Sequence, residues 1–126
     1  MKNINVLMNL LMTMRDQLRL YHWQTESYAR HKASDEFVTK ATEILDKIME
    51  THQGKYGRVK VNNNTNTIVL ENLDDNSIVE FLKTTHTFFV SDFPDYINKN
   101  ANTDLLNLRD ELLQTINKTL YLFSLE

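Results

Sequence analysis

The sequence predicts an all-α protein, and three observations lead to this prediction. Hydrophobic residues recur at helical spacing in four separate segments. Only two glycines and one proline occur in 126 residues, too few for the frequent turns of a β-sandwich or β-barrel. A chain of this length holds one core, so we expect residues 1–126 to form one helical-bundle domain.

The composition excludes several classes of function. A net charge of −3 argues against binding to nucleic acid, because such binding depends on clustered Lys and Arg. The absence of cysteine excludes disulfides, thiolate nucleophiles and zinc fingers. No apolar run approaches the roughly 20 residues of a membrane span, and no secretory signal is visible near the start. We therefore expect a cytoplasmic protein without a membrane partner.

The first helix is expected from Asn3 to about Trp23. Its core stripe is Ile4, Leu7, Met8, Leu11, Met14 and Leu18. Other apolar residues lie off this stripe: Leu10, Met12, Leu20 and Trp23. A helix that is apolar on more than one side can bury only one of these sides within its own bundle. The first helix therefore predicts a homo-oligomer, at least a two-fold dimer.

The second helix is expected from a cap at Thr25 or Ser27 to about Tyr56, with Gly57 ending it. Its predicted core face is Phe37, Ala41, Ile44, Leu45 and Ile48. Residues 58–75 then break the helical pattern. Val59 and Val61 alternate with Lys60, and an Asn/Thr run follows, which fits either a short hairpin or an irregular crossover.

The third helix is expected to begin at Asn76 or Ser77 and to end or bend near Phe93, because Pro94 disfavours helical backbone before it. The fourth helix follows a cap at Asn102 or Thr103. Short connections join helices one and two and helices three and four, and a long one joins two and three. This is the connectivity of a ferritin-like four-helix bundle with a long crossover.

Four side chains on the second helix are candidates for metal chemistry. They are His31, Asp35, Asp46 and Glu50. Within each pair the residues lie four apart, and the two aspartates lie eleven apart, which is three turns plus about 20°. The four therefore share one narrow stripe, more than about 100° from the centre of the core face. On spacing alone, a solvated polar face is the more common explanation of such a stripe.

The distance between the two pairs along the helix determines whether one chain could form a metal site on this stripe. At about 1.5 Å per residue, Asp35 and Asp46 lie roughly 16 Å apart along the helix. Metal–ligand bonds are near 2 Å long, so the two pairs cannot share an ion within one chain. Two copies of the helix, antiparallel across a two-fold axis, would bring opposite pairs together. Mixed His and carboxylate sites of this kind suit Fe(II), Mn(II) or Zn(II).

His22 fits two interpretations. It lies on the core stripe of the first helix, where a histidine is commonly a hydrogen-bonded core residue. It also ends the helix that turns back into His31, so it could reach the same site across the turn. His52 and His86 fall on apolar stripes, and we expect both to be core histidines.

The ligand order resembles the ferroxidase motif of the Dps proteins, a ferritin-like family of iron-oxidising shells. In that family a His-Trp pair ends the first long helix, as His22-Trp23 does here. His31, Asp35, Asp46 and Glu50 match the spacings of the family's second helix. The resemblance implies iron binding between subunits, with His22, His31 and Asp35 from one chain and Asp46 and Glu50 from its partner.

A closer similarity concerns the run from His22 to Ala33 and the run from Gln53 to Arg58. The two runs are similar to small uncharacterised proteins of large DNA viruses and phages. This similarity implies a viral origin, and a viral protein could be associated with the virion instead of the cytoplasm. The alternative function is a non-catalytic helical structural or interaction protein that keeps the fold. No basic tail follows Lys2, so DNA binding is not implied.

Overall fold

The computed structural model describes residues 2–61 and 66–125. These residues form four α-helices and a short 3-10 helix, and they contain no strand. The elements are α1 (Ile4–Gln24), α2 (Tyr28–Tyr56), α3 (Asp75–Ser91), η1 (Phe93–Tyr96) and α4 (Thr103–Ser124). The all-α prediction is confirmed. None of the helices in the described part of the chain is long and apolar enough to cross a membrane.

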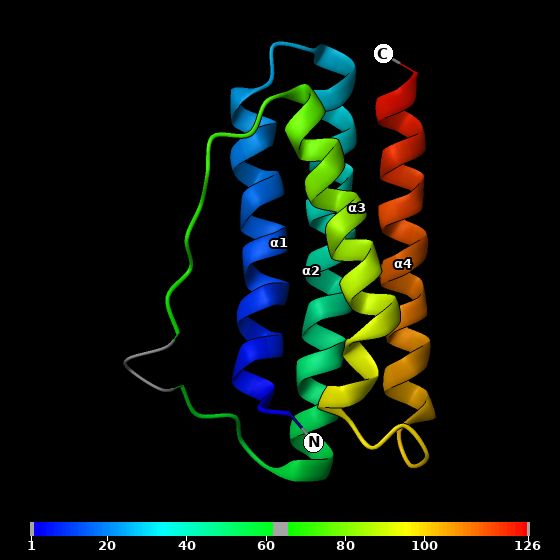
Figure 1. Cartoon of the computed structure of the whole chain (residues 1–126). Helices are drawn as coiled ribbons and strands as arrows, with labels where there is room; N and C mark the ends of the chain where they lie inside the picture. The colour runs from blue at the N-terminus through cyan, green and yellow to red at the C-terminus, as the bar shows by residue number, and fades with distance from the viewer. Residues whose placement is uncertain (1, 62–65, 126) are drawn as a thin grey trace.

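The helices lie side by side along a common direction (Figure 1). α1 and α2 are antiparallel neighbours, and so are α3 and α4. The long connection from α2 to α3 returns along the outside of α1, so α2 and α3 run in the same direction. α2 packs against α1 on one side and α4 on the other, and α3 packs against α4 and α1.

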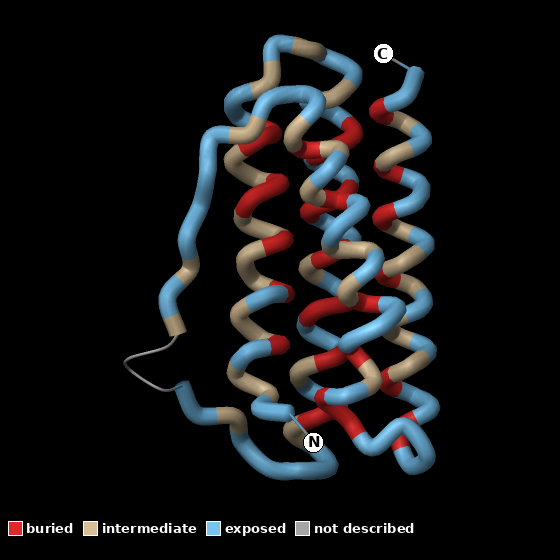
Figure 2. Tube along the Cα trace, in the orientation of Figure 1, coloured by how far each residue is buried: buried red, intermediate tan, exposed pale blue. Residues whose placement is uncertain are grey.

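The apolar stripes face one another and form the core (Figure 2). All five predicted core residues of α2 are buried, the most accessible being Leu45 at 7% exposure. On α1, the buried members of the predicted stripe are Leu7, Leu11, Met14 and Leu18. Ile4 and Met8, near the free end of α1, are half-buried. The hydrophobic periodicity therefore identified the inner faces of both helices.

Most predicted helix ends are confirmed. The Ser27 hydroxyl accepts a hydrogen bond from the Arg30 N–H at 3.1 Å and caps α2. Gly57 ends α2 with φ of +87°, a conformation that favours glycine. The expected start of α3 at Asn76 or Ser77 was wrong. The Asp74 carboxylate accepts the Ser77 N–H at 2.8 Å, so α3 begins at Asp75, and this bond lowers the pKa of Asp74.

The connection between α2 and α3 is an irregular crossover in residues 58–61 and 66–74, not a hairpin. The Asn/Thr run at 62–65 lies outside the described residues. Side chains of α1 hold the crossover in place. The Gln17 amide donates to the Glu71 carbonyl at 2.7 Å and accepts the Glu71 N–H at 3.0 Å. Asn9 donates to the Thr67 carbonyl at 2.9 Å.

Arg30 ties all four helices together at the end of the bundle where α1 meets α2. Its guanidinium donates to the Tyr21 hydroxyl on α1 at 3.2 Å and to the Asp75 carbonyl on α3 at 3.0 Å. It also donates to the Phe123 carbonyl on α4 at 3.3 Å and covers the Phe123 ring. Burial raises the pKa of Tyr21, and the hydroxyl donates its proton to the Asp75 carboxylate at 2.6 Å.

We expect Arg30→Gln to lower the free energy of unfolding by about 2 kcal/mol, because it removes hydrogen bonds from a charged donor that is largely shielded from water. Urea unfolding followed by circular dichroism measures this loss. Lys47→Gln is the matched control, since Lys47 is an exposed cation of the same helix. Equal midpoints for the two variants would contradict a role of Arg30 in holding the helices together.

Candidate metal centre

The turn between α1 and α2 brings His22 and His31 into contact. His22 lies in the last turn of α1, is 8% exposed and faces the core. His31 lies in the first turn of α2 and is exposed. Their rings stack at 3.8 Å between centroids, with 17° between the ring planes. His22 is thus a buried, hydrogen-bonded histidine, as the first interpretation predicted, and it also contacts the first residue of the α2 stripe.

Each histidine is hydrogen-bonded to the backbone of the other. The distance from His22 Nδ1 to the His31 carbonyl oxygen is 2.6 Å. The distance from His31 Nδ1 to the His22 carbonyl oxygen is 2.8 Å. A carbonyl oxygen can only accept, so Nδ1 carries a proton in both rings.

This arrangement leaves Nε2 as the lone-pair nitrogen of each neutral ring. Neither Nε2 has a hydrogen-bond partner among the described residues. Metal-binding histidines commonly donate their second nitrogen to a backbone carbonyl, which fixes the tautomer and the ring orientation. The pair therefore has the hydrogen bonding that metal ligation through Nε2 requires.

The carboxylates of the α2 stripe are exposed, as the spacing predicted. Asp35 lies one turn beyond His31, and Asp46 and Glu50 lie farther along α2. The structure therefore brings His22 and His31 together, with Asp35 one turn farther along α2, and leaves Asp46 and Glu50 toward the other end of the stripe. No group of three or more His, Asp or Glu that could hold a metal occurs within residues 2–61 and 66–125.

Arg19 is a member of this region that the sequence analysis missed. Its guanidinium donates to the Asp35 carboxylate at 3.1 Å, and the Asp35 side chain is 55% exposed. The Arg19–Asp35 pair could have been predicted from the sequence spacing of the two helices. Arg19 precedes His22 by about as many residues as Asp35 follows His31, so the two face each other once the histidines are adjacent.

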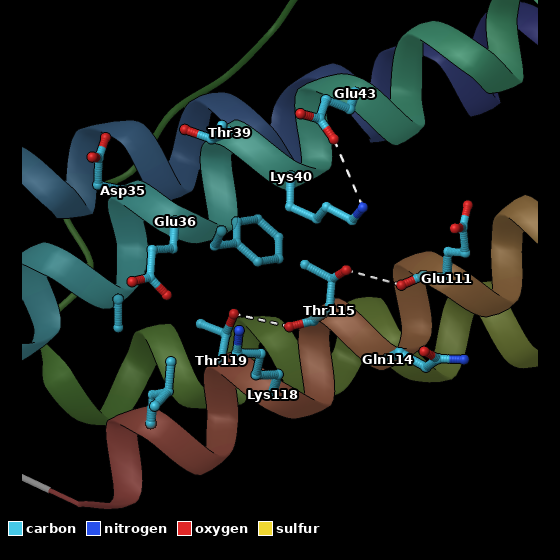
Figure 3. A pocket seen from close by; sticks show the side chains of 13 residues that line it. Asp35, Glu36, Thr39, Lys40, Glu43, Glu111, Gln114, Thr115, Lys118 and Thr119 are labelled. Carbon is cyan, nitrogen blue, oxygen red and sulfur yellow. Dashed lines mark hydrogen bonds and ion pairs between the residues drawn. The ribbon is translucent and has the colours of Figure 1, made fainter.

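A groove of about 670 Å³ lies between α2 and α4, and neither histidine of the pair lines it (Figure 3). Lys40 extends from α2 toward α4 and forms an ion pair with Glu43 at 3.7 Å. The Asp35 carboxylate points away from α4. Side chains of both signs line the groove, so it presents no single charge to a ligand.

The two histidines predicted for the core differ from each other. His52 is buried at 7% exposure, as predicted, and burial lowers its pKa below the usual value. His86 is only half-buried on α3. Its apolar neighbours Leu82 and Phe89 face the core more directly, and both are fully buried.

We expect the neutral form of both rings of the histidine pair to be the Nδ1–H tautomer, because each Nδ1 faces a carbonyl oxygen. Long-range nitrogen–proton correlation spectra of labelled protein distinguish this tautomer from the Nε2–H form. His86, whose ring nitrogens form no hydrogen bond among the described residues, serves as the comparison ring within the same spectrum. Nε2–H signals for His22 and His31 would show that the reciprocal hydrogen bonds do not form in solution.

The sequence comparison covers all five candidate residues. The chain matches DUF5856, a family of unknown function, over residues 22–123, which begins at the first histidine of the pair and ends in the last turn of α4. No curated protein and no solved structure matches the chain. Since the match covers about four fifths of the sequence, the chain belongs to the DUF5856 family.

Proposed function

We propose that this protein binds Fe(II) at a site shared by two copies of the chain and oxidises it. The observation that carries the proposal is the reciprocal hydrogen bonding of His22 and His31, which leaves the Nε2 lone pair of each of the two stacked rings free. Histidine nitrogens together with carboxylate oxygens form a donor set suited to Fe(II), and also to Mn(II) or Zn(II). Fe(II) is the substrate here, and dioxygen or peroxide would accept its electrons.

The helix connectivity supports a ferritin-like fold for this function. Two antiparallel pairs, α1 with α2 and α3 with α4, are joined by a single long crossover. Bundles with one such crossover include the ferritin-like folds, whose metal sites are formed by side chains of facing helices. The candidate residues lie on α1 and α2, which form one antiparallel pair.

A second copy is needed because one chain separates the ligands. With two α2 helices antiparallel across a two-fold axis, the end carrying His31 and Asp35 meets the end carrying Asp46 and Glu50 of the other copy. The contact is isologous, so it forms two identical sites. In each site a histidine Nε2 would bind the ion, and the carboxylates would favour Fe(III) because they supply negative charge.

Apolar side chains on the same side of α1 support this contact. Met12, Arg19 and Trp23 follow one another at seven and four residues, so they share the side of α1 that faces Asp35. Trp23 is 69% exposed, and Met12 is half-buried. Leu10 does not belong to this surface. It precedes Gln17 by seven residues and therefore lies on the side to which the crossover is tied.

Asp35 must leave Arg19 to bind a metal ion with both oxygens. An ion pair this exposed contributes only about 0.2–1 kcal/mol. A divalent ion held by several ligands offsets that cost, so the Arg19–Asp35 pair is compatible with metal binding. In the absence of metal, Arg19 neutralises one of the carboxylates of the stripe.

Anaerobic Fe(II) titration tests the shared site. We expect His31→Ala and Asp46→Ala each to lose most Fe(II) binding, since each removes a ligand from both sites. Glu80→Ala is the matched control, an exposed carboxylate on α3, away from the α2 stripe. Refolding the two defective chains together should restore about one quarter of the parent's sites, because every mixed dimer regains one intact site.

A site within one chain predicts a different result for that mixture. Neither chain then contains a complete ligand set, and mixing restores nothing. Binding by both single variants at the parent's level would show that the α2 stripe is only a solvated face. Light scattering on the parent, run in parallel, must show at least a dimer.

The Arg19–Asp35 ion pair favours a second candidate, a helical structural or interaction protein without catalysis, in the cytoplasm or in a virion. In that case the polar stripe of α2 carries only ion pairs and solvated side chains. The dimer would then serve assembly alone, and metal would have no effect on the stability of the protein.

Glu50→Gln distinguishes the two candidates. For a working site we expect Fe(II) oxidation, followed by Fe(III) absorbance, to fall sharply. Metal should raise the melting temperature of the parent more than that of the variant, because a ligand that binds only the native state stabilises it. Without metal, the variant should melt no lower than the parent, since it has lost one of several crowded carboxylates. No oxidation above background and no metal-dependent shift in the parent would support the structural candidate.

A further inference from the structure

A second cavity lies at the opposite end of the bundle from the histidine pair, where α1 begins and α2 ends. It has a volume of about 340 Å³, within the range of small-molecule sites. Gly57 and the bond from the Val59 N–H to the Gln53 side chain, at 3.1 Å, turn the chain back over the end of α2. This turn places Arg58 and Lys60 on the wall of the cavity.

The cavity is positively charged in a chain whose net charge is negative. Lys2, Arg58 and Lys60 line it, and no Asp or Glu is among the described residues that do so. Lys2 has an ion-pair partner outside the cavity, Asp95 at 3.7 Å. Arg58 and Lys60 form no ion pair within the described part of the chain. Cations gathered around a hollow focus their field and attract anions.

The base and sides of the cavity are aromatic. His52 is buried, and its Nδ1 has no hydrogen-bond partner among the described residues. Its ring lies 4.8 Å from that of Tyr56, which is 44% exposed. Tyr96 lines the cavity from η1, with the Lys2 ammonium 5.8 Å from its ring. Buried polar atoms are rarely left without a hydrogen-bond partner. The unpaired Nδ1 of His52 therefore indicates that a bound molecule supplies its partner.

We infer that this cavity binds a small phosphorylated molecule with a flat ring, of the class of the nucleoside monophosphates. The planar guanidinium of Arg58 suits two oxygens of one phosphate, and the lysines add charge. Tyr56, at 44% exposure, offers its ring to a base, and the buried rings of His52 and Tyr96 support it from the protein side. The net negative charge of the whole chain opposes a long polyanion, so a small ligand is favoured over nucleic acid.

Calorimetric titration with adenosine monophosphate, inorganic phosphate, adenosine and a single-stranded oligonucleotide tests the inference. We expect the monophosphate to bind one molecule per chain, phosphate to bind more weakly, and adenosine to bind least. Arg58→Gln and Lys60→Gln should each weaken the monophosphate by about tenfold. Arg58→Lys should recover only part of the loss. Lys47→Gln, an exposed cation elsewhere on α2, should bind as the parent does.

Four results would overturn the inference. They are no binding of the monophosphate at millimolar concentration, equal affinities for monophosphate and phosphate, unchanged binding in Arg58→Gln, and an oligonucleotide that binds more tightly than the monophosphate. The last would indicate a nucleic-acid surface instead. Circular dichroism of each variant, matched to the parent, confirms that the substituted side chain and not the fold causes the change.

Discussion

The mutual hydrogen bonds of His22 and His31 fix the relation between the two helices on which the rest of the candidate site depends. Each ring is held by the backbone of the other helix, at 2.6 and 2.8 Å, so neither helix can slide along its axis without breaking both bonds. The same contacts set the tautomers of the rings and place Arg19 opposite Asp35. The short turn between α1 and α2 therefore determines three things: the register of the two helices, the histidine nitrogens left free, and the Arg19–Asp35 ion pair near them.

This end of the bundle is also where the other helices are anchored. Arg30 is one residue before His31, and its guanidinium reaches backbone or side chains of α1, α3 and α4. At the far end, Lys55 joins α2 to the start of α4 by donating to the Asp104 carboxylate at 2.6 Å, which lowers the pKa of Asp104. α2 is thus fixed at both ends, and the polar stripe between them lies on a rigid, well-packed helix.

Local patterns in the sequence were sufficient to predict much of this arrangement. Hydrophobic spacing identified the helices and their inner faces, and the same periodicity placed Asp35, Asp46 and Glu50 on the exposed side of α2. Features that depend on contacts between distant residues were not predictable in the same way. The path of the crossover depends on Gln17, a polar residue buried because it bonds to Glu71, 54 residues away. The Arg19–Asp35 pair could be predicted only with the register between α1 and α2 known. The first residue of α3 depends on which of several neighbouring polar residues caps the helix.

The crossover has a consequence for how copies of this chain can associate. Because Gln17 and Asn9 bind it to one flank of α1, a neighbour that packs on α1 meets the crossover on that flank, whereas the flank shared with α2 is free of it. A contact between identical flanks is self-complementary and closes once two chains have joined. Growth of an assembly beyond such a pair would then use other surfaces, among them α3 and α4. The placement of one irregular segment would thus separate the surface proposed to complete the metal site from a surface that enlarges the assembly.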